Sequence, residues 1–180
     1  AAHGLAAVKE NGREVLFISD HSPNGKVYKT TLDGEILMTV SCPMESKLYK
    51  TPNEFKPAKT LHLPNGEFFV IDGYGKDYIH KFSSLGKWIS AFGGDIGSGE
   101  AHLKHWGPHG GAIDFRNPKQ PVMILALSDQ QKIKRFKLNG EWIDTKIFPG
   151  SNPRDVIFHR RHLFVHHLGD NWPKDRNAPG

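Results

Sequence analysis

The feature that most constrains the fold is an internal repeat, which aligns without gaps over three ten-residue segments, 27–36, 79–88 and 133–142. Each segment has a β-branched residue first, a basic residue third, a glycine eighth and a large apolar residue tenth. Alternating side chains before a glycine-containing turn, followed by further apolar residues, are typical of a β-hairpin. The repeat therefore predicts the same hairpin three times.

Two further strands are predicted upstream of each hairpin. One of them ends at an acidic residue in every copy, namely Asp20, Asp72 and Asp129. The other is expected over residues 4–8, 59–63 and 111–115, each followed by a turn sequence. The repeating unit thus has four short strands, and its turn glycines (Gly34, Gly86 and Gly140) are 52 and 54 residues apart.

Four-stranded units in series are typical of the blades of a β-propeller. We therefore expect an all-β propeller of four-stranded antiparallel blades, over residues 1–45, 54–94 and 107–149, with a partial blade over 150–180. A β-sandwich or β-solenoid also uses short strands, but neither explains repetition of a complete four-strand unit. Four units of about 54 residues need about 216, and propellers have four to eight blades. The 180 residues are thus expected to form one domain fragment, an incomplete ring of about three and a half blades.

Composition excludes several other classes of protein. The longest apolar run, residues 122–127, is far shorter than the roughly 20 residues of a membrane-spanning helix, so no membrane span is expected. Cys42 is the only cysteine, which excludes an intrachain disulfide and predicts an unreactive thiol. The net charge of +5 comes from scattered residues, which argues against nucleic acid as a partner.

Three short segments carry a resemblance to a known family. They are Ala-His-Gly-Leu at residues 2–5, Trp-Gly-Pro-His-Gly at 106–110 and Asp-Gly-Tyr-Gly-Lys-Asp-Tyr-Ile at 72–79. In these segments the sequence resembles NHL-repeat propellers, and within them the six-bladed peptidyl-α-hydroxyglycine α-amidating lyases. The resemblance implies release of glyoxylate from a peptidyl-α-hydroxyglycine, which leaves a peptide amide, and it implies a protein that is secreted or otherwise outside the cytoplasm.

The same resemblance implies roles for particular residues. His3 and His109 match histidines that bind zinc, and a third histidine ligand would lie beyond this chain segment. The carbonyl of Leu5 matches a calcium ligand, and Tyr74 matches a tyrosine implicated in the acid/base step. Gly75 departs from the family pattern, because the lyases have a disulfide-forming cysteine at that position.

Other site residues are expected at the rim. Tyr78 stands where the lyases have arginine, and His167 and Asp170 end a strand where a propeller loop faces the channel mouth, so all three are candidate substrate contacts. Each candidate also has a structural interpretation. The histidines of the first strands could be packing residues, Tyr74 could be an ordinary turn residue, and Trp88 and Trp142 are expected to pack between blades.

Two hypotheses about function follow. The first is a metal-dependent, lyase-like propeller that acts on a peptide or small-molecule substrate and is expected to be monomeric. The second is a non-catalytic propeller that binds a peptide, protein or carbohydrate while its histidines are structural. RNA binding through a basic face is a third possibility, and the scattered charges argue against it.

Overall fold

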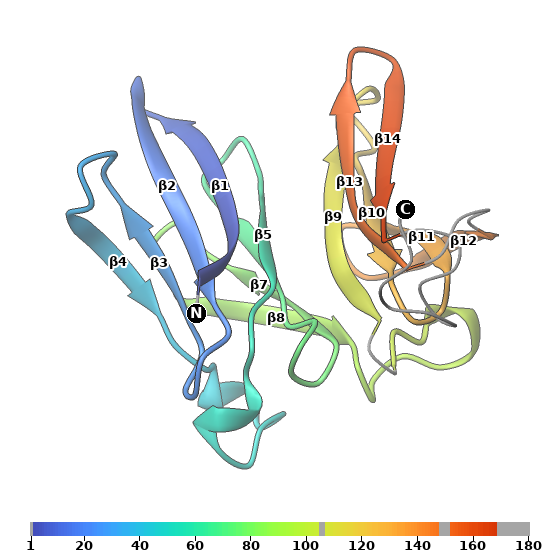
Figure 1. Cartoon of the computed structure of the whole chain (residues 1–180), viewed down its shortest axis with the longest axis horizontal. Coiled ribbons are helices and arrows are strands. Elements are labelled where there is room, and N and C mark those ends of the chain that lie inside the picture. Colours follow the sequence, from blue (N-terminus) through green and yellow to red (C-terminus); the bar gives the residue numbers. More distant parts are fainter. Residues whose placement is uncertain (1, 105–106, 148–151, 169–180) are drawn as a thin grey trace. The chain divides into compact units, whose positions relative to one another are not determined.

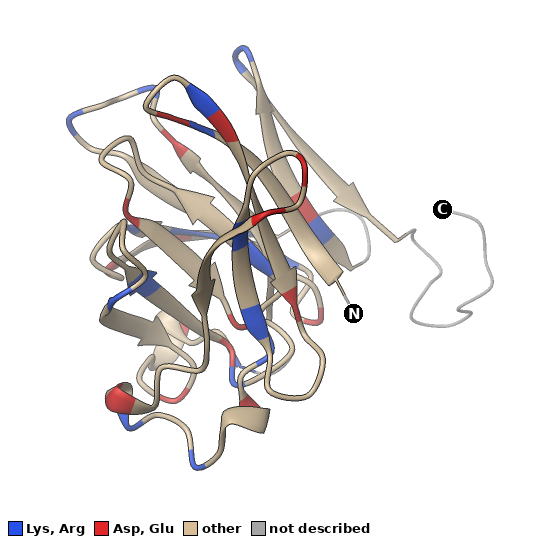
Figure 2. Cartoon of the chain, turned by 90° about the vertical axis from the view of Figure 1, so that its left-hand side faces the viewer, with Lys and Arg blue, Asp and Glu red and all other residues tan. Residues whose placement is uncertain are grey.

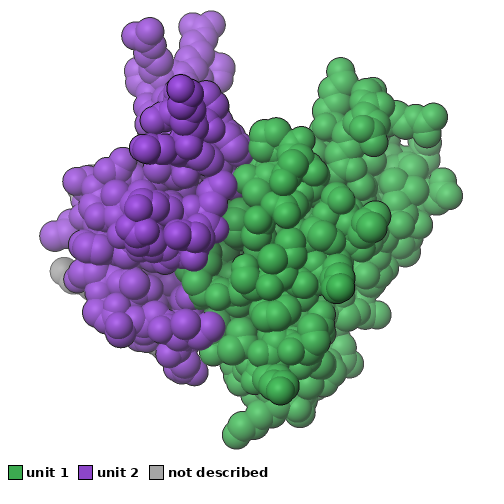
Figure 3. All heavy atoms as spheres, turned by 180° about the vertical axis from the view of Figure 1, so that it is seen from behind, with its two compact units in different colours: residues 1–92 green, residues 93–180 purple. Residues whose placement is uncertain are grey.

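A computed structural model of the chain describes residues 2–104, 107–147 and 152–168. Within these residues the strands form four antiparallel sheets (Figure 1). The chain divides into two compact units, residues 1–92 and residues 93–180 (Figure 3). The described part of the chain contains no helix with the length and apolar character needed to cross a bilayer.

The first unit, residues 1–92, contains two sheets of four strands in sequential order. The first sheet consists of β1 (Ala2–Glu10), β2 (Arg13–Asp20), β3 (Lys26–Thr30) and β4 (Ile36–Val40). The second consists of β5 (Lys59–His62), β6 (Phe68–Ile71), β7 (Tyr78–Phe82) and β8 (Trp88–Gly93). Both match the predicted four-strand unit.

The second unit contains a third four-stranded sheet and a two-stranded one. The larger sheet consists of β9 (Pro108–Asp114), β10 (Val122–Leu127), β11 (Lys132–Lys137) and β12 (Trp142–Ile147). The smaller pairs β13 (Pro153–His159) with β14 (His162–His167). The predicted partial blade is therefore present as a hairpin among the described residues.

The repeat glycines make the same turn in all three four-stranded sheets. Gly34, Gly86 and Gly140 have φ values of 90°, 76° and 91°, a region that favours glycine because it has no Cβ. Each donates its N–H to the carbonyl three residues earlier, over 3.2, 2.9 and 3.0 Å respectively. The conserved position of glycine within the repeat thus has a direct conformational cause.

The core of the first unit lies between its two sheets. Phe17 of β2 packs with Phe68 and Phe82 of the second sheet, and Phe55 from the connecting segment is also fully buried. All four residues of β6 are buried, as expected for an apolar strand covered on both faces. Trp88 packs against this core, in agreement with the predicted role.

Long connections follow the first and second sheets. The connection after β4 contains two 3₁₀ helices, η1 (Met44–Ser46) and η2 (Pro52–Glu54), and the connection after β8 contains η3 (Gly99–Ala101). Lys134 of β11, whose side chain is 3% exposed, donates from Nζ to the carbonyls of Glu100 (2.7 Å) and His102 (2.9 Å). A buried ammonium group therefore fastens η3 to the third sheet.

The strand register corrects one predicted equivalence. The first repeat residue pairs with the preceding strand in each sheet, Val27 with Ser19, Ile79 with Ile71 and Ile133 with Ala126. The next position is therefore Asp20, Asp72 and Leu127 in the three sheets. Asp129 lies two residues further on and is exposed in the turn, which spans only residues 128–131 here but residues 72–77 in the second sheet. The predicted equivalence of Asp129 is wrong.

Two other expectations concern the surface and the thiol. Trp142 is 38% exposed, and its indole N–H donates to Thr145 Oγ1, so its packing between blades stays a prediction. Cys42 is buried, and burial raises the pKa of its thiol to about 12, as an unreactive cysteine requires. Basic and acidic residues are interspersed along the ribbon in Figure 2, in agreement with the scattered charge of the sequence.

Candidate functional site

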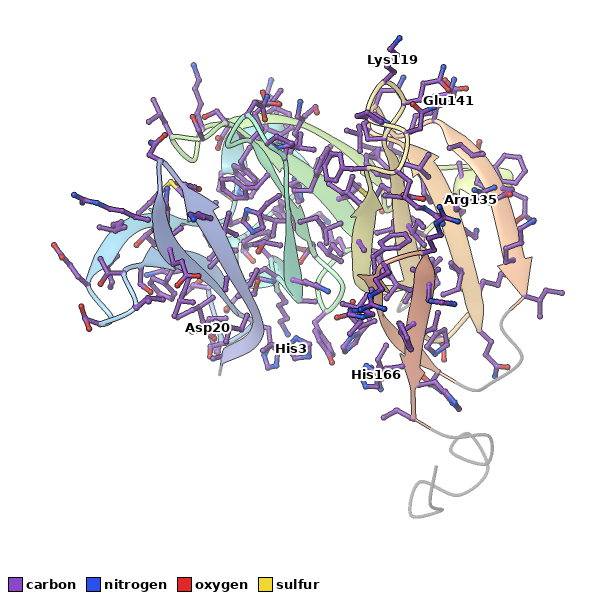
Figure 4. The ribbon with its side chains drawn as sticks, turned by 90° about the horizontal axis from the view of Figure 1, so that it is seen from above. His3, Asp20, Lys119, Arg135, Glu141 and His166 are labelled. Carbon is purple, nitrogen blue, oxygen red and sulfur yellow. The ribbon has the colours of Figure 1, made fainter. Side chains whose placement is uncertain are left out.

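His3 lies at the start of β1, near Asp20 at the end of β2, which is the strand paired with it (Figure 4). Its Nδ1 is 3.0 Å from the carbonyl oxygen of Ala58. A carbonyl can only accept a hydrogen bond, so Nδ1 carries a proton, and in the neutral imidazole Nε2 has the lone pair. Nε2 lies 3.1 Å from Tyr74 Oη, which then donates to it.

His109 has the same arrangement in the second unit. It lies in β9, the first strand of its sheet, and its Nδ1 is 3.0 Å from the carbonyl oxygen of Arg154. Arg154 belongs to β13 and Ala58 directly precedes β5, so each histidine donates to a carbonyl at or just before the first strand of the sheet that follows. The same tautomer, with Nε2 as the acceptor or ligand nitrogen, is therefore fixed in both units.

The glycine after each histidine is required by the same close approach. A Cβ at Gly4 would lie 2.2 Å from the Ala58 oxygen, and a Cβ at Gly110 would lie 2.5 Å from the Arg154 oxygen. Any larger residue would push away the strand whose carbonyl holds the imidazole. The His-Gly dipeptide found twice in the sequence is thus a device that orients a first-strand histidine.

Tyr74 is carried by a turn built around the buried carboxylate of Asp72. Asp72 Oδ1 accepts the backbone N–H of Lys56 (2.6 Å), and Oδ2 accepts the N–H of Lys76 (2.8 Å) and the hydroxyl of Tyr49 (2.6 Å). The Tyr74 N–H donates to the carbonyl of Lys56 over 3.3 Å. The turn is therefore fixed to the segment that precedes β5.

The carboxylate of Asp72 ends a chain of buried hydrogen bonds. Trp88 Nε1 donates to His80 Nδ1 (3.2 Å), so His80 carries its proton on Nε2 and donates to Tyr49 Oη (2.7 Å). Burial lowers the pKa of His80 to about 3, which keeps the imidazole neutral. Burial also raises the pKa of Asp72 to about 7, although its hydrogen bonds act in the opposite direction.

The position where the resembled lyases have a cysteine has no room for a side chain here. A Cβ at Gly75 would lie 2.1 Å from Asp72 Oδ1 and 2.4 Å from the carbonyl oxygen of Glu54. Noncovalent contacts join the turn to the preceding connection instead. Lys76 Nζ donates to the carbonyl of Leu48 (3.2 Å) and pairs with Glu54 (3.2 Å).

His21 belongs to the same cluster, and the sequence analysis missed it. Its ring centroid is 5.3 Å from that of His3 and 5.1 Å from that of Tyr74, while His3 and Tyr74 are 4.9 Å apart. His21 lies in the connection between β2 and β3, outside every motif. Its position directly after Asp20, in the loop opposite the start of β1, was the signal that could have indicated it.

The remaining candidates are placed differently. Leu5 lies within β1 opposite Ile18, with its side chain 66% exposed, and the calcium role of its carbonyl stays a prediction. Tyr78 is 3% exposed and packs near Tyr49 and His80, so it belongs to the core and not to a ligand-accessible rim. His167 is half-buried at the end of β14, and Asp170 lies outside the described residues.

The histidines fit zinc as single ligands. Neutral imidazole with its second nitrogen bonded to a carbonyl is the usual form of a zinc-ligating histidine. Within residues 2–104, 107–147 and 152–168, no group of three or more His, Cys, Asp or Glu side chains is gathered around one point. His3 and His109 each have the right tautomer, while a complete ligand set is not present in this part of the chain.

No family model matches the chain, and the search of curated proteins found no match. Several solved structures are similar. They include a catalytically inactive histidine-to-alanine variant of virginiamycin B lyase from Staphylococcus aureus, with quinupristin (TM-score 0.65, 16% identity, 95% of this chain and 50% of that one). The chain also resembles the Nidogen/Laminin complex (TM-score 0.61, 15% identity, 94% of this chain and 58% of that one). A third similar structure is the Dos1 propeller (TM-score 0.59, 16% identity, 94% of this chain and 40% of that one).

The chain is a β-propeller. Its four-stranded antiparallel sheets are the predicted blades, and the similar structures have this fold. The chain spans about half the length of the structures that it matches, which have 50%, 58% and 40% of their residues covered. At 15–16% identity these likenesses show the fold alone.

Proposed function

We propose that the chain is part of a metal-dependent, lyase-like propeller that acts on a peptidyl-α-hydroxyglycine or a related small substrate. The observation that carries the proposal is the repeated hydrogen bond from Nδ1 of His3 and His109 to a backbone carbonyl of the following blade. In the neutral imidazole this bond leaves the lone pair on Nε2 in both blades. The proposed ligands of zinc are therefore these two Nε2 atoms, with a third histidine supplied from outside this segment.

Zinc held in this way would supply a Lewis acid that polarises the substrate hydroxyl group. The residues of the chain supply orientation and proton transfer. In the lyase reaction the bond between the hydroxyglycine Cα and the amide nitrogen breaks, the hydroxyl proton leaves as the aldehyde of glyoxylate forms, and the amide nitrogen gains a proton. Tyr74 Oη, at 3.1 Å from His3 Nε2, is the group proposed to transfer the proton from the substrate hydroxyl to the amide nitrogen.

The contact between Tyr74 and His3 also has a consequence for metal binding. One lone pair of Nε2 can accept the tyrosine proton or ligate a metal ion, but it cannot do both. A metal ion held by Nε2 of His3 would take the place of this hydrogen bond, and the Tyr74 hydroxyl would then be able to contact the substrate. The hydrogen-bonded turn around Asp72 keeps the tyrosine within reach in either state.

One of the similar structures supports this choice of function. Virginiamycin B lyase has the same fold, and its histidine-to-alanine variant is catalytically inactive. A β-propeller can thus carry a lyase activity that depends on a histidine.

The test is an assay of glyoxylate release from a hydroxyglycine-extended peptide, together with zinc content, for the full-length protein and two variants. We expect stoichiometric zinc and glyoxylate release in the wild type, and loss of both in His109→Ala. The matched control is His162→Ala, which removes an exposed histidine from β14. A well-folded wild type without zinc and without glyoxylate release would contradict the proposal and favour a non-catalytic binding propeller.

A further inference from the structure

We infer that His21 is a second imidazole ligand at the His3 metal site, so that the first unit alone offers two nitrogen ligands to one zinc-class ion. The inference rests on the proposed function only in that His3 ligates a metal. It differs from that proposal because nothing in the sequence motifs involves His21. Three features support it: the distance between the His3 and His21 rings, the contacts that fix the loop of His21, and the accessibility of both side chains.

The ring separation fits two ligands of one ion. Zinc lies about 2.0–2.1 Å from a ligating imidazole nitrogen, which is itself about 1.1 Å from the ring centroid, so the ion is about 3.2 Å from the centroid. Two imidazoles that ligate one ion at the tetrahedral angle then have centroids about 5.2 Å apart. The centroids of His3 and His21 are 5.3 Å apart, with ring planes inclined at 48°.

The loop that carries His21 is fixed by its neighbours. Asp20 Oδ1 accepts the N–H of Ser22 over 2.9 Å, which closes a turn around His21. The N–H of Asn24 donates to Asn53 Oδ1 over 2.9 Å. Gly25 packs so closely on the following segment that an added Cβ would lie 2.4 Å from a backbone oxygen of that segment. His21 is therefore held in place from both sides.

The same short segment, residues 53–58, holds all three members of the cluster. It receives the His21 loop through Asn53, the Tyr74 backbone through the carbonyl of Lys56, and the His3 imidazole through the carbonyl of Ala58. Ligands that are positioned before the metal arrives lose little conformational entropy when they bind it. The shared segment makes the His3 and His21 pair such a preorganised site.

The cluster is also accessible, since His3 is exposed and His21 is half-buried. Imidazole nitrogens suit zinc, copper and nickel, and the positions left by two histidines can be taken by water, substrate or further protein ligands. The geometry thus points to a divalent transition metal as the ion.

The test is calorimetric titration of Zn²⁺ into the chelator-stripped, full-length protein and four variants, His21→Ala, His3→Ala, His109→Ala and the control His162→Ala. Loss even of a residue that only supports a metal ligand typically weakens affinity about 10–100-fold. We therefore expect His21→Ala and His3→Ala each to weaken zinc affinity by at least about tenfold, while His162→Ala leaves it unchanged.

Paramagnetic Co²⁺ in the wild-type protein gives a second readout that needs no variant to fold. The inference predicts contact-shifted ring N–H signals, which only coordinated imidazoles give, from both His3 and His21, and such a signal from His3 without one from His21 would overturn it. Wild-type affinity in His21→Ala, with loss in His3→Ala, would overturn the inference and leave the proposed function standing. Loss in His21→Ala but not in His109→Ala would support the inference and contradict the zinc ligands of the proposed function.

Discussion

Replacement of Tyr49 by phenylalanine tests the buried hydrogen-bond chain of the first unit. Tyr49 is 6% exposed, and its hydroxyl accepts from His80 and donates to Asp72, both of which are completely buried. The variant leaves the Nε2–H of His80 without its acceptor and removes one of three donors to the Asp72 carboxylate. A buried polar group left without its partner costs about 1–3 kcal/mol. Only the Nε2–H of His80 loses its partner completely, since Asp72 keeps two donors, so we expect a loss of about 2 kcal/mol in the free energy of unfolding.

The assay is urea denaturation at pH 7, followed by tryptophan fluorescence, because Trp88 donates into the same chain of hydrogen bonds. Tyr28→Phe, at a half-buried position of β3, is the matched control and is expected to change stability by less than about 0.5 kcal/mol. A Tyr49→Phe loss as small as that of the control would refute the reasoning, since it would mean that the buried network does not stabilise the unit.

Two further predictions concern pH and close packing. Burial lowers the pKa of His62 to about 4 and that of His80 to about 3, so below pH 6.5 both take up protons in the unfolded chain before they do in the folded one. Asp72, with its pKa raised to about 7, has the opposite effect, because the folded chain binds its proton first. Two protons favour the unfolded chain and one favours the folded chain, so the urea midpoint is expected to be lower at pH 4.5 than at pH 6.5. The reverse order would contradict this. Gly4→Ala, which places a Cβ 2.2 Å from the Ala58 oxygen, is expected to cost about 1–3 kcal/mol of unfolding free energy, and an unchanged midpoint would count against the packing argument.

Features that one or two adjacent residues encode were predictable from the sequence. A glycine at the eighth repeat position, such as Gly86, is needed because the hairpin turn requires positive φ there. The repeated glycine was therefore enough to predict the turn. The His-Gly dipeptides behaved in the same way. Their repetition indicated that His3 and His109 are equivalent, and the structure places both against a carbonyl of the following blade.

Features that depend on distant contacts were not predictable. The carbonyl that orients His3 is 55 residues away. The loop of His21 is fixed through Asn24, whose partner Asn53 is 29 residues further along the chain. Nothing in the local sequence reports either contact. Tyr78 was mispredicted for the same reason. Its motif suggested a position at the rim, whereas its side chain is buried beside His80, a member of the hydrogen-bond network of Asp72.

The most direct test of the account is a crystal structure of the zinc-saturated full-length protein with anomalous data collected at the zinc edge. The account predicts an anomalous peak about 2.0–2.1 Å from the Nε2 atom of His3, with Nδ1 still bonded to the Ala58 carbonyl and the Tyr74 hydroxyl released. A structure in which His3 Nε2 keeps its hydrogen bond to Tyr74, with no zinc beside it, would contradict the account.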